Sequence, residues 1–115
     1  MTHRIDVEAL NELREIMEDD FDMLLDHYVS VSLELIDEMG TDLSRGDRAA
    51  LSRTAHSLKG SSLNLGAKAL AQRCAVLEQQ ARETRSADSL EALIRCIAEE
   101  YQGTVTDLQA LRKQT

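Results

Sequence analysis

Apolar residues recur at intervals of three and four along almost the whole chain, and no proline interrupts this pattern. Such spacing places apolar side chains along one face of an α-helix. Aromatic residues make up only 3% of the chain and tryptophan is absent, a composition that is poor for β-sheets. The sequence therefore predicts an all-α protein.

The apolar stripes divide the chain into five helical segments. The first segment is short, whereas the other four are long and joined by short connections. Long amphipathic helices with short connections favour an antiparallel four-helix bundle, here with a short additional N-terminal helix. The expected helices cover about 6–17, 19–39, 47–65, 67–84 and 88–111.

Capping residues set the expected ends of these helices. Asp6 and Asp47 stand before apolar stripes and are expected to be N-caps. Asp88 is followed three residues later by Glu91, which resembles a capping box for the last helix. Gly40 follows the last apolar residue of the second stripe, so we expect that helix to end there and a loop to cover 41–46.

The length of 115 residues predicts a single domain over 1–115. No stretch approaches the ~18 uninterrupted apolar residues of a membrane span, and the first residues do not resemble a signal peptide. We therefore expect a cytoplasmic protein, and the initial methionine favours an independent protein over a domain of a larger hybrid kinase. Cys74 and Cys96 lack CxxC spacing, so we expect reduced core residues.

The charge of the chain is unevenly distributed. The net charge of −8 disfavours nucleic-acid binding, which needs a positive surface. Residues 1–41 carry two basic and twelve acidic side chains, whereas residues 42–73 carry six basic and two acidic ones. The second region is thus a positive segment in an acidic protein, and it can attract an acidic partner to one face.

One helix face in this positive segment combines a histidine, a lysine and a glycine. His56, Lys59 and Gly60 stand at positions i, i+3 and i+4, which share a helix face. His56 is two residues from Leu58 of the apolar stripe, about 200° around the helix axis, so its ring should point away from the core. Glycine in a helix is less favourable than alanine by roughly 1 kcal/mol, which indicates that this face benefits from bare surface.

This combination suits the handling of a phosphoryl group. A neutral imidazole is a nucleophile near pH 7, and the nearby ammonium of Lys59 can balance a phosphate. Ser57, Ser61 and Ser62 are small and can offer hydroxyl groups. No residue nearby resembles a general base aimed at water, so a group carrier fits better than a hydrolase.

The chain resembles the histidine-containing phosphotransfer (HPt) domain of bacterial multistep phosphorelays through one string, His56-x-x-Lys59-Gly60-Ser61-Ser62, followed by Leu65-Gly66-Ala67. The resemblance implies that His56 is the phospho-acceptor, that Lys59 stabilises the phosphoryl group and that Gly60 opens the surface. It also implies a carrier without kinase activity, not an enzyme. Such a carrier accepts the group from a phospho-aspartyl receiver domain of a hybrid kinase or response regulator and relays it to another receiver aspartate.

The resemblance further implies a polar residue 22 positions after the histidine that orients the imidazole. Here that position is Glu78, and Gln79 is the alternative if the helix register differs by one. Leu70, Cys74 and Leu77 define the inward face, which favours Glu78 because it lies beside that face. A carboxylate there would fix the tautomer of the ring and raise its basicity.

The resemblance implies that the domain holds no metal and no cofactor, and that the Mg²⁺ ion and the acceptor aspartate belong to the receiver. We expect partner contacts from Arg53, Ser57, Ser61, Leu63 and Lys68. Other candidates for this docking face are the basic residues Arg45, Arg48 and Arg73 and the apolar Leu43. The partners are receiver domains, not nucleic acid or membrane, and the protein is expected to be a monomer.

Three alternatives compete with a phosphoryl carrier. A histidine kinase would need a Gly-rich ATP-binding domain, and it usually has an acid where Ser57 follows His56. A metal-binding bundle would need Glu-x-x-His pairs, and the sequence has none. A non-catalytic helical adaptor that binds receiver or kinase partners is the alternative that a phosphoryl-transfer assay must decide. His3 and His27 have no comparable neighbours, and we expect a disordered terminus and a polar helix face for them.

Overall fold

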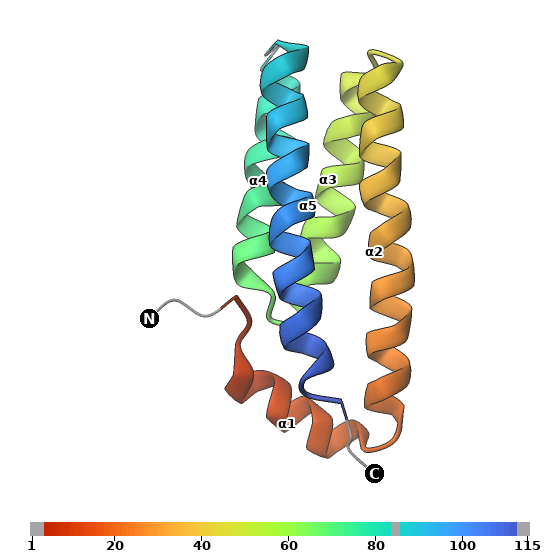
Figure 1. Cartoon of the computed structure of the whole chain (residues 1–115), viewed down its shortest axis with the longest axis vertical. Helices are drawn as coiled ribbons and strands as arrows, with labels where there is room; N and C mark the ends of the chain where they lie inside the picture. The colour runs from red at the N-terminus through yellow and green to blue at the C-terminus, as the bar shows by residue number, and fades with distance from the viewer. Residues whose placement is uncertain (1–3, 84–85, 113–115) are drawn as a thin grey trace.

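The computed structural model describes residues 4–83 and 86–112, and these residues form helices without any strand (Figure 1). Four long helices run antiparallel in a bundle, and the short α1 crosses one end of it. The predicted all-α four-helix bundle with an extra N-terminal helix is confirmed. The helices are α1 (Val7–Met17), α2 (Asp20–Ser44), α3 (Arg48–Asn64), α4 (Lys68–Arg82) and α5 (Ala87–Gln109).

The core lies between the apolar stripes of the long helices. Helix α3 packs against α2 on one side and α4 on the other, while α5 closes the bundle against α2 and α4. On α3 the buried stripe contains Leu51, Ala55 and Leu58, none of which has any exposed surface. Arg53, His56 and Ser57 lie on the opposite side of α3 and are exposed, so the buried stripe fixes the direction in which His56 points.

Two predicted N-caps are confirmed. The Asp6 carboxylate accepts a hydrogen bond from the backbone N–H of Ala9 at 3.1 Å, and Asp47 accepts one from Ala50 at 3.0 Å. Each bond satisfies an N–H group that a helix start would otherwise leave without a partner. Asp47 therefore marks the start of α3, the helix that carries His56.

The prediction that α2 ends at Gly40 is wrong, because the helix continues to Ser44. Met39 and Asp42 are both buried, and the Asp42 carboxylate accepts a 2.8 Å hydrogen bond from the Thr54 hydroxyl of α3. These contacts extend the inward face of α2 beyond Gly40. The chain turns instead at Gly46, whose φ of +68° is the left-handed conformation that glycine adopts readily.

The predicted capping box at Asp88 is also wrong. Helix α5 begins one residue earlier, at Ala87, and Ser86 is its N-cap. The Ser86 hydroxyl accepts a 3.1 Å hydrogen bond from the N–H of Ser89, and Asp88 lies in the first turn. A negative charge there is favourable because it lies close to the positive end of the helix dipole.

Neither cysteine forms a disulfide. Cys74 is fully buried on α4, whereas Cys96 on α5 is only half-buried, so the prediction of a core position holds for Cys74 alone.

None of the helices in the described part of the chain has the length and apolar character that a membrane span requires.

Candidate functional site

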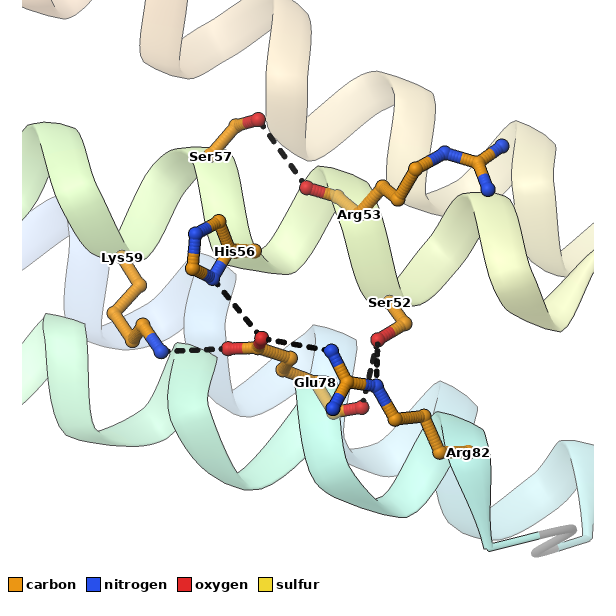
Figure 2. Close-up of polar contacts among 7 residues, drawn as sticks. All are labelled: Ser52, Arg53, His56, Ser57, Lys59, Glu78 and Arg82. Atoms are coloured by element: carbon orange, nitrogen blue, oxygen red, sulfur yellow. Dashed lines mark hydrogen bonds and ion pairs between the residues drawn. The ribbon is translucent and has the colours of Figure 1, made fainter.

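His56 projects from the outer face of α3 (Figure 2). Its side chain is 66% exposed, while the neighbouring Ala55 is fully buried. This agrees with the outward direction expected from the helical pattern. The ring therefore stands where another macromolecule can reach it.

The Glu78 carboxylate of α4 lies against this ring and forms hydrogen bonds with three side chains (Figure 2). Nδ1 of His56 is 3.0 Å from Oε2 of Glu78, and Nζ of Lys59 donates to Oε1 at 2.7 Å. Arg82 lies one turn further along α4 and donates from Nη2 to Oε2 at 3.2 Å. The neighbouring Gln79 instead bonds Glu83, so Glu78 is the residue that contacts the ring.

These contacts keep Glu78 ionised although its side chain is only 11% exposed. The hydrogen bond from Lys59 lowers the pKa of the Glu78 carboxyl; partial burial opposes this, and the bond to His56 adds to it. An ionised carboxylate can only accept hydrogen bonds, so Nδ1 of His56 must donate. In the neutral ring, Nε2 then carries the free electron pair.

Gly60 leaves open space one turn along from His56. A Cβ atom built at Gly60 would meet no atom within 4 Å. The surface beside the ring is therefore bare because a side chain is missing, and the fold does not require a glycine there. A helix-interior glycine without a packing reason suggests a role outside the fold.

The sequence interpretation missed two residues of this site, Ser52 and Arg82. The Arg82 Nε atom donates to the Ser52 hydroxyl at 3.1 Å, and that hydroxyl donates to the Glu78 backbone carbonyl at 3.0 Å. Ser52 is buried and belongs to α3, so this chain of bonds joins the two helices beneath the ring. The sequence signal for Arg82 was its spacing of four residues from Glu78, which places the two side chains on one face of α4. Ser52 had no such signal.

Four of the expected partner contacts lie along α3 near His56. Arg53, Ser57 and Leu63 are exposed, with Leu63 at 54%, and Ser61 is half-buried. The hydroxyl of Ser57 donates to the Arg53 carbonyl at 3.2 Å, and that of Ser61 to the Ser57 carbonyl at 3.1 Å. Both serines therefore satisfy their hydroxyl protons within the helix and present small surfaces.

The other expected docking residues are dispersed. Lys68 is exposed at the start of α4, where its ammonium lies 3.5 Å from the Asp6 carboxylate. Arg73 pairs with Glu100 of α5 at 3.2 Å, so it faces α5 and not His56. The interpretation of Leu43 as an exposed contact is wrong, because this residue is half-buried against the core.

One other histidine, His27, lies in the described part of the chain. His27 is exposed on α2, and it lines a hollow of about 250 Å³ with Tyr28 and Ser61. His3 lies outside the described residues. In the residues that the structure describes, no group of three or more His, Cys, Asp or Glu side chains is placed to hold a metal ion.

Comparisons with known proteins agree with this geometry. The family model of the Hpt domain matches residues 23–113. The crystal structure of histidine-containing phosphotransfer protein B (HptB) from Pseudomonas aeruginosa PAO1 is similar to this chain, with a TM-score of 0.83 and 35% sequence identity. The match covers 97% of this chain and 100% of that one. No curated protein matches the chain. The chain therefore belongs to the Hpt domain family, whose members carry phosphoryl groups on histidine in phosphorelays.

Proposed function

We propose that His56 accepts a phosphoryl group from the phospho-aspartate of a receiver domain and passes it to the aspartate of another receiver. The observation that carries this proposal is the exposed ring of His56, with Nδ1 held by Glu78 and Nε2 facing solvent. The similarity to HptB, a histidine-containing phosphotransfer protein, supports it. Receivers of hybrid kinases and of response regulators are the proposed partners.

The transfer step requires no proton transfer at the ring. The electron pair of Nε2 forms a bond to phosphorus while the bond from phosphorus to the aspartyl oxygen breaks, and that oxygen leaves with its electron pair as carboxylate. The proton stays on Nδ1, so the phosphorylated ring becomes cationic. The Glu78 carboxylate, 3.0 Å from Nδ1, stabilises this positive charge. Glu78 is thus an orienting and electrostatic group and not a general base.

Lys59 supplies the charge that balances the incoming phosphoryl group. Its side chain lies one turn from His56 and is only 27% exposed, so the ammonium is held close to the ring. A flexible stem allows the ammonium to turn from Glu78 toward a phosphate. Gly60 leaves room for the receiver, whose reacting aspartate must come within bonding distance of Nε2.

The docking surface consists of the exposed outer face of α3 and the start of α4. Leu63 offers apolar area, and Arg53 and Lys68 offer positive charge. A receiver carries a cluster of acids around its Mg²⁺ ion, so opposite charges meet. In this proposal the chain itself holds no metal or cofactor, has no intrinsic kinase activity, and acts as a monomer in the cytoplasm.

A transfer assay with purified proteins tests the proposal. A phospho-receiver with labelled phosphate is mixed with the wild-type protein, with His56→Gln and with His27→Gln. His27 is the matched control because it is an exposed histidine on a different helix, α2. Wild type and His27→Gln should take the label, and His56→Gln should take none.

Two results would overturn the proposal. One is label retained on the His56→Gln variant, which would place the acceptor elsewhere. The other is no label on the wild-type protein from any of a panel of receivers that it binds. Binding without transfer would instead favour a helical adaptor.

A further inference from the structure

Lys59 has two roles that compete. In the unphosphorylated protein its ammonium lies 2.7 Å from Oε1 of Glu78, so its charge is already engaged. To bind a phosphoryl group on His56, Lys59 must loosen that bond. The carboxylate would then lose its shortest ion pair while its side chain is only 11% exposed, and a nearly buried charge without a partner is unfavourable.

Arg82 contacts the same carboxylate through its other oxygen. Its Nη2 atom donates to Oε2 at 3.2 Å, and Oε2 is also the oxygen that accepts from Nδ1 of His56 at 3.0 Å. Lys59 uses Oε1 alone. The release of Lys59 therefore leaves untouched both bonds at the oxygen that faces the ring.

Arg82 is fixed from a second side as well. Its Nε atom donates at 3.1 Å to the hydroxyl of Ser52, a buried residue of α3. A guanidinium that donates through two nitrogens is held in one orientation. An exposed ion pair is usually weak because its side chains are free to move, and the Ser52 anchor removes part of that freedom.

We propose that Arg82 is a positioning residue for phosphoryl transfer: it keeps the Glu78 carboxylate against Nδ1 of His56, both in the unphosphorylated protein and when Lys59 moves to the phosphate. This inference rests on the proposed function of His56. Before transfer, two cations face one carboxylate, which leaves one unit of positive charge. A dianionic phosphoryl group on a cationic ring adds one negative charge, so the phosphorylated site is neutral. Without Arg82 it would carry one uncompensated negative charge.

The experiment compares Arg82→Gln, Arg82→Lys and Arg73→Gln with the wild type. Arg73 is the matched control, since it is an exposed arginine of the same helix that pairs with a different carboxylate, Glu100. Phosphoramidate, a small donor, reports on the ring without receiver docking. Nitrogen NMR of the unphosphorylated protein reports which ring nitrogen of His56 carries the proton, and thermal melting reports folding.

We expect Arg82→Gln to slow phosphorylation about 10-fold, the lower end of the loss seen when the hydrogen-bond partner of a metal-bound histidine is removed. Its imidazole should show a mixture of tautomers, while wild type and Arg73→Gln hold the proton on Nδ1. Arg82→Lys should recover most of the rate and of the tautomer preference. Ser52→Ala, which removes the anchor but leaves the arginine, should shift both readouts in the same direction by less.

The inference would be overturned if Arg82→Gln had the same phosphorylation rate and tautomer as Arg73→Gln. It would also be overturned if Arg82→Lys kept the wild-type melting temperature but recovered neither the rate nor the tautomer. If Arg82→Gln does not fold, Ser52→Ala with the wild-type rate and tautomer would overturn it. These results differ from a failure of the proposed function, in which the wild type itself takes no phosphoryl group on His56.

Discussion

Two carboxylates of this bundle are built in nearly the same way but differ in what they present to solvent. Glu78 is 11% exposed and Glu100 10%, and each holds two cationic side chains. Around Glu100 the partners are Arg4 at 2.8 Å and Arg73 at 3.2 Å. Only Glu78 has an exposed imidazole as an additional partner. Each carboxylate therefore joins separate segments of the chain through ion pairs, and in our proposal the histidine makes the Glu78 cluster reactive.

The two glycines near these clusters differ in the same way. A Cβ atom at Gly60 would meet nothing within 4 Å, whereas one at Gly103 would overlap the guanidinium of Arg4. Gly103 is thus covered by the Arg4 side chain, which a larger residue would have to displace. The space beside Gly60 is open, whereas the space beside Gly103 is filled by a side chain of the N-terminal segment.

The largest expected effect comes from removing each carboxylate in turn. Glu78→Ala leaves the ring of His56 without its acceptor, so transfer from a phospho-receiver should fall about 10- to 100-fold. Glu100→Ala should lower stability by about 1 kcal/mol, since two ion pairs are lost, but leave transfer unchanged. The measurement is the initial transfer rate beside thermal melting. Equal effects of both variants on transfer would remove the distinction between the two clusters.

Filling the two glycine positions tests access. Gly60→Gln adds a good helix former to open space, so stability should rise by up to ~1 kcal/mol. Transfer from a receiver should fall about 10-fold, which corresponds to about 1.4 kcal/mol of lost docking, while phosphorylation by phosphoramidate stays at the wild-type rate. Gly103→Gln displaces Arg4 and should change neither rate. If Gly60→Gln slowed phosphorylation by phosphoramidate as much as transfer from a receiver, the glycine would affect the reactivity of the His56 ring and not the docking of the receiver.

Removing Lys59 gives a smaller effect. Lys59→Ala takes away the charge proposed to balance the phosphoryl group, so transfer should slow about 5-fold, equivalent to about 1 kcal/mol in the barrier. Arg73→Ala, at the other carboxylate, should leave transfer at the wild-type rate. Melting temperatures check that both variants remain folded. A large loss of stability in Lys59→Ala would assign this lysine a structural role instead.

The smallest effect is the pH dependence of stability. The folded protein holds the pKa of Glu78 below its ordinary value of 4.5, mainly through the bond to Lys59. The stabilisation is therefore present above that value and is lost as pH falls through the lowered pKa. The difference in unfolding free energy between wild type and Glu78→Gln should shrink by under about 1 kcal/mol from about pH 6 to about pH 3. A constant difference would show that the carboxylate is not stabilised in its charged form.

Sequence reasoning could predict the features that depend on local pattern. The stripe of Leu51, Ala55 and Leu58 fixed the outward direction of His56, and the stripe that includes Cys74 placed Glu78 beside the inward face of its helix. The end of α2 was not predictable from Gly40, because its continuation depends on the buried contact of Asp42 with Thr54.

Contacts between distant segments could not be predicted in the same way. Arg82 is exposed and Ser52 is a buried serine, and no sequence pattern indicates that these two side chains meet. Their hydrogen bond exists only because α3 and α4 pack with a particular register. The pair of Arg4 and Glu100 is separated by 96 positions, so only the folded chain brings it together.

The most direct test of the account is to locate the phosphoryl group in the phosphorylated protein. Phosphorus and nitrogen NMR together identify the bonded ring nitrogen and the nitrogen that keeps the proton. The account predicts a single phosphoryl group on Nε2 of His56, with the proton on Nδ1 facing Glu78. A phosphoryl group on Nδ1, or on another residue such as His27, would contradict it.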